Sequence, residues 1–175
     1  MTPAGSASVH ASAVRVGTHA VLVRGPSGSG KSRLALDLIL AGRSQQVPPT
    51  TLVGDDRVHL DTVDGKLTVR PSRELAGLIE VRGLGIRRCD FVSEAIVGLV
   101  VDLGAPDAER LPPSEALLTQ IFGVWIPRIP VGTGYSALPL VIAALTMTES
   151  SGSVQLLADC PKGIGNHISR SIATK

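Results

Sequence analysis

The sequence predicts an α/β fold in which a mixed sheet is flanked by helices. Short apolar runs rich in β-branched residues alternate with turn-forming residues along most of the chain. A glycine-rich segment at residues 25–32 stands between one such run and an amphipathic stretch, the order strand, turn, helix. Hydrophobic residues make up 43% of the chain and charged residues only 18%, which is typical of a sheet buried on both faces. Because aromatic residues make up only 2%, aliphatic side chains must fill the core.

The elements of the first half follow in order. An extended segment over 8–16 and a short run over 20–24 predict a hairpin. Apolar residues recur at helical spacing from Lys31 to Ala41, and Gly42 is placed to end that helix. An apolar segment over 51–53 predicts a strand that ends at a pair of aspartates.

Further strands are expected in the second half. Asp64-Gly65 predicts a hairpin turn between strands over 58–61 and 66–70. The stretch 77–86 is interrupted by glycines and lacks helix signals, whereas the apolar run 96–103 predicts a central strand.

The last elements are a strand and two helices. Ser114 is placed to cap a short helix over 115–120, and residues 124–131 predict a strand interrupted by two prolines. A longer helix is expected over 138–148.

Length and composition predict one domain over residues 1–150, followed by a loosely held tail over 151–175. The net charge is only +2 and the basic residues are scattered along the chain rather than clustered, so nucleic acid is not an expected partner. The longest apolar segments fall short of the roughly 20 residues that span a bilayer, and no signal-peptide pattern opens the chain. Cys89 and Cys160 form no metal-type pair. A cytoplasmic protein without membrane insertion is expected.

The glycine-rich segment fits the phosphate-loop pattern G-x-x-x-x-G-K-[S/T]. Its backbone N–H groups form an anion-binding nest at a helix N-terminus, Lys31 reaches the β- and γ-phosphates, and Ser32 is a ligand for Mg²⁺. The pattern therefore predicts a P-loop nucleotide-binding core that binds ATP with Mg²⁺. Its residues are Gly25, Pro26, Ser27, Gly28, Ser29, Gly30, Lys31 and Ser32.

The phosphate loop alone does not choose among kinases, GTPases and motor ATPases. The guanine-specifying pattern N-K-x-D is absent from the chain, which disfavours a GTPase. The paired carboxylates Asp55 and Asp56 favour phosphoryl transfer, because one can accept a hydroxyl proton while the other positions the metal or the loop. Which is the base stays open at this point, with Asp56 preferred. A small-metabolite kinase and a non-catalytic, ATP-dependent regulatory module remain as alternatives.

Four further segments, taken with the phosphate loop, resemble the catalytic domain of bacterial HPr kinase/phosphorylase over roughly residues 9–147. They are Val-His-Ala-Ser-Ala-Val at 9–14, Leu-Val-Gly-Asp-Asp-Arg-Val at 52–58, Leu-Ile-Glu-Val-Arg-Gly-Leu-Gly-Ile at 78–86 and Glu-Arg-Leu at 109–111. The resemblance implies an ATP-dependent protein serine kinase, an HPr-like phosphocarrier as partner and a homohexamer.

The resemblance also assigns roles to single residues. It implies that His10 belongs to the active site, that an aspartate of the pair takes the proton from the substrate serine, and that Glu80 is a second Mg²⁺ ligand. Arg82 lies in a turn that serves phosphoryl transfer in both directions, and Arg110 stands where an active-site arginine is expected.

Two departures from the family pattern stand out. The family carries an N-terminal domain, whereas only a few residues precede the first matching segment, so a truncated form is expected. The family loop P-V-R-P-G-R-N is here Pro-Val-Gly-Thr-Gly-Tyr-Ser at residues 130–136, without either arginine. Since two cations are missing from a phosphate clamp, we expect kinase activity to persist and phosphorylase activity to be weak.

Overall fold

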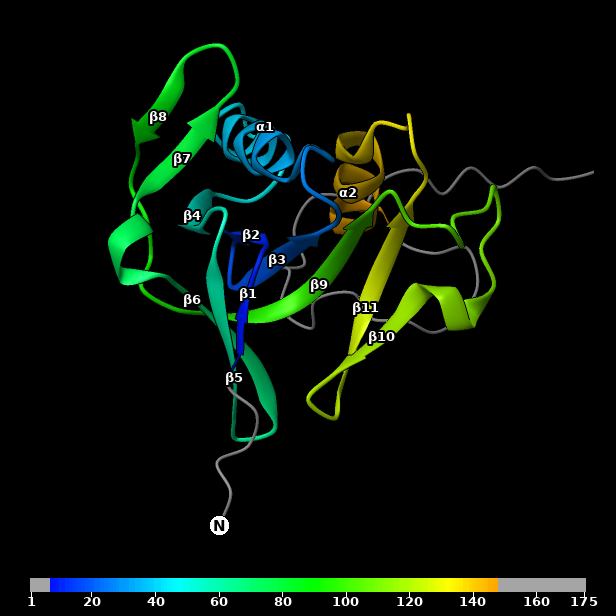
Figure 1. Ribbon diagram of the computed structural model, residues 1–175. Helices are drawn as coiled ribbons and strands as arrows, with labels where there is room; N and C mark the ends of the chain where they lie inside the picture. Colours follow the sequence, from blue (N-terminus) through cyan, green and yellow to red (C-terminus); the bar gives the residue numbers. More distant parts are fainter. Residues whose placement is uncertain (1–6, 148–175) are drawn as a thin grey trace, which may run out of the picture.

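A computed structural model describes residues 7–147 of the chain (Figure 1). Most of its strands belong to one sheet, which contains, in spatial order, β1 (Ala7–Val9), β5 (Val58–Val63), β6 (Lys66–Pro71), β9 (Ala95–Leu103), β3 (His19–Arg24), β2 (Ser12–Val16) and β4 (Thr50–Gly54). β11 (Val124–Val131) pairs with the second half of β9, and β10 (Leu118–Ile121) pairs with β11. A mixed sheet flanked by helices is thereby confirmed. The predicted tail and Cys160 lie outside the described residues.

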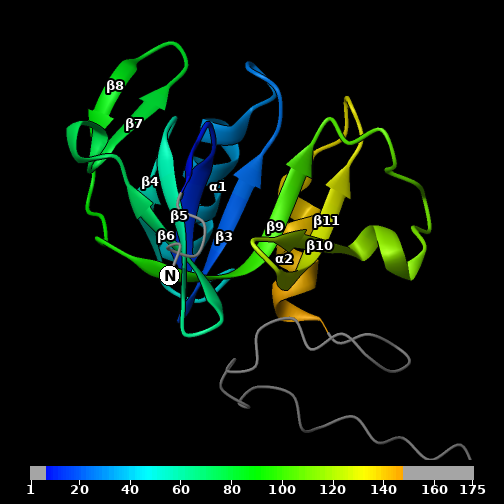
Figure 2. The same ribbon diagram turned by 60° about the horizontal axis from the view of Figure 1, so that its bottom comes forward.

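Strand directions bring four carboxyl ends to one edge of the sheet. β9 runs parallel to both β3 and β11, and β4 runs parallel to β3 because each is antiparallel to β2. We call the edge where β3, β4, β9 and β11 end the carboxyl edge (Figure 2). In open α/β sheets, ligands bind outside such ends.

The sheet is covered on both faces, as the composition predicts. Helices α1 (Lys31–Arg43) and α2 (Ala137–Thr146) lie on one face (Figures 1 and 2), where they pack against Val21 and Val101. On the other face the hairpin of β5 and β6 encloses a second core with Leu22 and Val100. The buried core of the described residues is aliphatic, while all four aromatic side chains, Phe91, Phe122, Trp125 and Tyr135, are at least 40% exposed.

Most of the predicted elements are confirmed, including both hairpins, the central strand β9 and the two longer helices. The extended segment over 8–16 is divided at His10 and Ala11 into β1 and β2. The glycine-punctuated stretch forms a separate hairpin of β7 (Leu78–Val81) and β8 (Gly85–Arg88). Neither described helix has the length and apolar character needed to cross a membrane.

The predicted helix over 115–120 is wrong. Residues Ser114–Leu117 form a 3₁₀ turn that leads directly into β10, and its N-cap is Pro113 rather than Ser114, which lies inside the turn. The turn Phe122-Gly123, in which both residues have positive φ, then returns the chain into β11. Pairing with β11 decides the outcome, because a segment this short has little helical stability of its own.

The prediction that Gly42 ends the first helix is also wrong. The helix continues to Arg43, and Gly42 lies inside its last turn. A Cβ atom at Gly42 would lie 2.7 Å from Thr50 Oγ1 and 2.8 Å from Thr50 N. The glycine is therefore needed for the close approach of α1 to β4, and not for a helix stop.

The role of α1 in the core gives a first prediction. Leu38 is fully buried between helix and sheet, whereas Leu40 on the same helix is 47% exposed. Leu38→Ala is expected to lower the free energy of unfolding by about 3 kcal/mol, because it leaves a cavity in a core that cannot collapse fully. Leu40→Ala, the matched control, should cost less than about 1 kcal/mol. Urea denaturation checks both, and equal losses would contradict this packing.

Candidate active site

The phosphate loop, residues Gly25–Ser32, joins the end of β3 to the first turn of α1 at the carboxyl edge. Gly25 has φ +147°, and a Cβ atom there would lie 2.7 Å from the Leu103 carbonyl oxygen. Gly30, at the N-cap of α1, has φ +98°, and its carbonyl accepts the first helical hydrogen bond, from Leu34 N at 2.9 Å. The positive φ at both positions favours glycine, and at Gly25 a side chain would also collide with Leu103. The order strand, glycine-rich turn, helix is therefore as the sequence predicts.

Lys31 folds back over the phosphate loop. Its side chain is buried, and Nζ donates hydrogen bonds to the carbonyl oxygens of Gly25 at 3.1 Å and Pro26 at 3.0 Å. Ser29 Oγ is buried and has no hydrogen-bond partner among the described residues. Phosphate oxygens could accept hydrogen bonds from both groups, from Lys31 Nζ in place of the two carbonyl oxygens and from Ser29 Oγ, which has no partner within residues 7–147.

The two aspartates after β4 lie in different environments. Asp55 is buried, Ser12 Oγ donates to its Oδ1 at 2.5 Å, and Glu80 N donates to its Oδ2 at 3.0 Å. Asp56 has a side chain that is 67% exposed. Because both oxygens of Asp55 accept hydrogen bonds inside the protein, Asp55 joins β2, β4 and β7, while the carboxylate of Asp56 faces solvent.

Asp56 and His10, which are far apart in the sequence, lie side by side. His10 Nε2 is 3.0 Å from Asp56 Oδ1, and both side chains are largely exposed. Asp56 has φ +64°, within a tight turn closed by a 2.7 Å hydrogen bond from Arg57 N to Asp55 O. A positive φ is uncommon for a residue with a side chain, and such backbone concentrates at functional sites.

The remaining predicted residues come from the β7–β8 hairpin and from the loop after β9. Glu80 lies on β7, and its backbone is held near Asp55 by the hydrogen bond described above. Arg82 lies in the turn between β7 and β8, and Arg110 lies in the loop after β9; both are exposed. Among residues 7–147, the side chains of Glu80, Arg82 and Arg110 make no hydrogen bond or ion pair. The structure thus leaves these three groups available to ligands without joining them to one another.

An ion-pair network next to the phosphate loop, which the sequence did not predict, joins the ends of β3 and β9 to β11. Arg24 Nε and Nη2 donate to the two oxygens of Asp102 at 2.7 and 2.8 Å, and Arg128 Nε donates to Asp102 Oδ2 at 2.5 Å. Arg128 also donates to both oxygens of Asp107 at 2.6 and 2.9 Å, and to the carbonyl oxygen of Ala116 at 3.0 Å. A signal was present, since Arg24, Asp102 and Arg128 are charged residues in otherwise apolar runs.

The network shifts the pKa values of its members. Burial by itself would raise the pKa of the Asp102 carboxyl, but hydrogen bonds from Arg24 and Arg128 outweigh it and hold that pKa below its ordinary value. The hydrogen bond from Arg128 likewise lowers the pKa of Asp107, and it raises the pKa of the Arg128 guanidinium. Both oxygens of Asp102 accept hydrogen bonds from these two arginines, so the carboxylate is held within the network.

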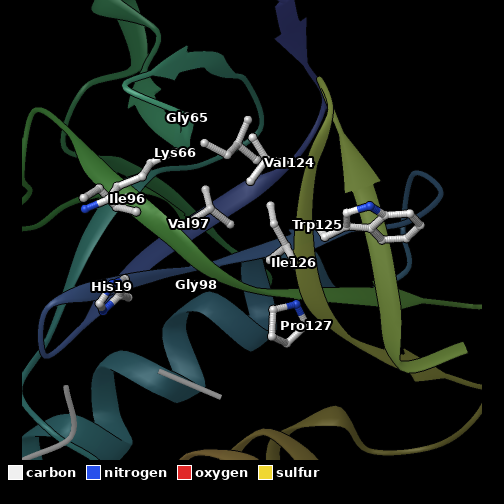
Figure 3. Close-up of a pocket in the computed structure, with 11 residues that line it drawn as sticks. His19, Gly65, Lys66, Ile96, Val97, Gly98, Val124, Trp125, Ile126 and Pro127 are labelled. Carbon is white, nitrogen blue, oxygen red and sulfur yellow. The ribbon is translucent and has the colours of Figure 1, made fainter. Parts of the chain in front are cut away.

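The pocket drawn in Figure 3 is separate from these groups. It has a volume of about 230 Å³ and lies near the amino ends of β3, β9 and β11, with His19, Val97 and Trp125 among its lining residues. None of the residues predicted for the active site lines it. The predicted site therefore lies at the opposite ends of the same strands, on the loops of the carboxyl edge.

Comparison with known proteins gives consistent matches. The family model described as HPr Serine kinase C-terminal domain matches residues 2–153. The chain is 32% identical over 166 residues to the HPr kinase/phosphorylase of Mycoplasma mycoides, covering 86% of this chain and 50% of that protein. It is 38% identical over 154 residues to the HPr kinase/phosphorylase of Enterococcus faecalis, covering 79% of this chain and 47% of that protein. The chain thus spans about half the length of the curated relatives it matches.

A solved structure agrees with these matches. The Hpr(Ser) kinase/phosphatase from Coxiella burnetii superposes with a TM-score of 0.62 at 28% sequence identity. The alignment covers 79% of this chain and 93% of that chain. Similarity in sequence and similarity in fold therefore point to the same family.

The lowered pKa of Asp102 predicts a pH-dependent contribution to stability. A carboxyl whose pKa is depressed by folding stabilises the protein above its unfolded pKa, and this stability is lost as the pH falls through the folded pKa. Asp102→Asn is expected to lower the free energy of unfolding by about 2 kcal/mol at pH 7. The difference from wild type should shrink as the pH is lowered below the ordinary carboxyl pKa of 3.8.

Urea denaturation at pH 7 and at pH 3 checks this prediction. Asp37→Asn is the control, because it removes an ion pair with Arg33 on the surface of α1. Such an exposed pair is expected to contribute less than about 1 kcal/mol at either pH. A deficit of Asp102→Asn that stays constant with pH would contradict the assignment.

Proposed function

We propose, because the chain belongs to the HPr serine kinase C-terminal domain family, that it transfers the γ-phosphoryl group of ATP to a serine of an HPr-like phosphocarrier protein. The observation that carries the proposal is that the phosphate loop, Asp56 and His10 come to the same edge of the sheet from separate strands. A cradle for the phosphoryl donor and a carboxylate that can take a hydroxyl proton are the two parts this reaction requires.

The phosphate loop would bind the nucleotide. Its free backbone N–H groups would surround an anion at the N-terminus of α1, where the helix dipole also favours negative charge. Lys31 Nζ now donates to two carbonyl oxygens of its own loop. In the proposed complex it exchanges these partners for β- and γ-phosphate oxygens, which are stronger acceptors.

Ser32 and Glu80 are proposed to hold Mg²⁺. Both supply the oxygen ligands that this ion prefers, and the Glu80 carboxylate is exposed. Residues 7–147 contain no group of three or more His, Cys, Asp or Glu side chains that could hold a metal. This fits an ion that takes most of its ligands from phosphate and water. When bound, Mg²⁺ neutralises the charge of the β- and γ-phosphates.

Asp56 is the proposed general base. It accepts the proton of the substrate serine as the seryl oxygen bonds to the γ-phosphorus and the bond from that phosphorus to the β-phosphate oxygen breaks, leaving ADP. His10, at 3.0 Å from Asp56, orients the carboxylate. Asp55 has a different part, since its two oxygens hold Ser12 and the Glu80 backbone and so fix the loop that carries Asp56.

Arginines complete the proposed site. Arg82 and Arg110 are exposed cations on loops beside the carboxyl edge, and each could stabilise charge that develops on the transferred phosphoryl group. A homohexamer and a cytoplasmic location belong to the same proposal, and they rest on the family resemblance.

The proposal is tested by the intact mass of an HPr-like phosphocarrier after incubation with this protein and Mg-ATP. We expect a gain of one phosphoryl group on serine. Asp56→Asn should lower kcat by about 10²-fold to 10⁴-fold, the usual contribution of a general base, with unchanged stability because the side chain is 67% exposed. Asp55→Asn should instead lower the melting temperature. Transfer at the wild-type rate by Asp56→Asn would exclude it as the base, and no transfer by the wild-type protein despite ATP binding would refute the kinase proposal.

The loop after β11 generates a prediction for the reverse reaction. Residues 132–136 carry no cation. This loop and the phosphate loop both lie near Gly104, where a Cβ atom would be 3.7 Å from Pro26 and 3.9 Å from Thr133. Dephosphorylation of the seryl-phosphorylated carrier by phosphate or pyrophosphate should run at less than about a tenth of the forward rate, since losing charged hydrogen bonds costs at least a factor of ten.

Phosphate release from the phosphorylated carrier, measured beside ATP-dependent phosphorylation, checks this expectation. The double variant Gly132→Arg with Tyr135→Arg, which places arginines at the two positions of the family loop, should raise the reverse rate. Comparable forward and reverse rates in the wild-type protein would show that the missing arginines are not needed.

A further inference from the structure

The Arg24–Asp102–Arg128–Asp107 network, which we call the arginine clamp, connects the strands and loops around the phosphate loop. Arg24 is the last residue of β3, directly before Gly25, and is the register partner of Asp102 on β9. Arg128 lies on β11, and Asp107 lies in the loop that follows β9. The Arg128 guanidinium on β11 therefore contacts Asp102 on β9 and Asp107 in the loop after β9. Asp102 in turn links it to Arg24 at the end of β3.

The clamped loop begins in contact with the phosphate loop. The Leu103 carbonyl oxygen and Gly104 border Gly25 and Pro26, as the close approaches at both glycines show. Ala105 N donates a 2.9 Å hydrogen bond to the carbonyl oxygen of Val131. The segment after β9 thus passes between the phosphate loop and the loop after β11, and the position of each depends on the others.

Arg128 cannot itself be a group that contacts substrate. Its side chain is 13% exposed, and each of its three guanidinium nitrogens donates to Asp102, Asp107 or Ala116. The Asp107 side chain is 48% exposed, and both of its oxygens accept hydrogen bonds from Arg128. Partly buried ion pairs add little net stability, because desolvation offsets most of their attraction, but a two-bond pair between guanidinium and carboxylate fixes geometry.

We propose that Arg128 is a positioning residue, which holds the segment from Gly104 to Arg110 in place beside the phosphate loop through Asp102 and Asp107. Arg110 follows Asp107 by three residues on this segment. Releasing Asp107 therefore frees Arg110 to move away from the transferred phosphoryl group. The consequence for catalysis rests on the proposed kinase function, whereas the consequence for the order of the segment does not.

The contacts separate two effects. Asp107→Asn detaches the segment and leaves the Arg24–Asp102–Arg128 pairs in place below the phosphate loop. We expect faster amide hydrogen exchange over residues 105–113, a kcat for carrier phosphorylation lowered about tenfold by misplacement of Arg110, and a Kd for Mg-ATP within twofold of wild type.

Arg128→Gln removes both carboxylate contacts, so it should also weaken Mg-ATP binding. Arg128→Lys, which keeps the charge but not the fork, should recover only part of the loss.

The matched control is Asp61→Asn, which removes the ion pair with Arg70 on β5 and β6, away from the phosphate loop. It should leave exchange over 105–113, kcat and the Kd of Mg-ATP unchanged. Hydrogen exchange is followed by mass spectrometry, and Mg-ATP binding by calorimetry. Asp107→Asn is the decisive variant if Arg128→Gln does not fold, because it alters only the exposed end of the clamp.

The outcomes separate this inference from the proposed function. If wild type phosphorylates the carrier and Asp107→Asn matches Asp61→Asn in exchange and kcat, the positioning role is refuted. A lowered kcat with unchanged exchange also overturns it, since Asp107 would then act directly. If wild type transfers no phosphoryl group, the kinase proposal fails, and hydrogen exchange over 105–113 in Asp107→Asn still decides whether the clamp orders the segment.

Discussion

The close contact between the phosphate loop and the end of β9 is the constraint on which the site depends. Gly25 approaches the Leu103 carbonyl oxygen so closely that no Cβ atom fits between them. This approach requires β3 and β9 to run parallel and in register, which the pairing of Arg24 with Asp102 secures. Because backbone rather than side chain forms this boundary, the shape of the phosphate loop is set by the sheet itself.

Burial gives adjacent aspartates different tasks. Asp55 is enclosed by Ser12 and the Glu80 backbone, so both of its side-chain oxygens accept hydrogen bonds inside the protein. Asp56 lies in the turn after β4 with a positive φ, and its exposed carboxylate contacts His10. Asp55 therefore serves as a structural hydrogen-bond acceptor, because both of its oxygens are occupied. Asp56 stays available as a proton acceptor, because its carboxylate faces solvent.

Periodicity and turn chemistry predicted most of the elements because they are local properties. The β-type runs before Gly25 and up to Leu103, and the Asp64-Gly65 hairpin, contain enough information in their own residues. The failures at Ser114 and Gly42 occurred where a distant partner decided the outcome. β11 draws the segment after Ser114 into a strand, and β4 passes so close to α1 that Gly42 serves packing.

The sequence by itself determined the phosphate loop, the aliphatic core, the position of the aspartate pair at a strand end and the resemblance to the family, since each depends on residue type at fixed spacing. Only the tertiary structure decided which groups meet. The pairing of His10 with Asp56, the hydrogen bonds to Asp55 and the arginine clamp join residues that are 21 to 78 positions apart in the sequence. These contacts form because β3, β4, β9 and β11 run parallel, which brings the ends of separate strands to one edge of the sheet. No local sequence pattern encodes this order of strands.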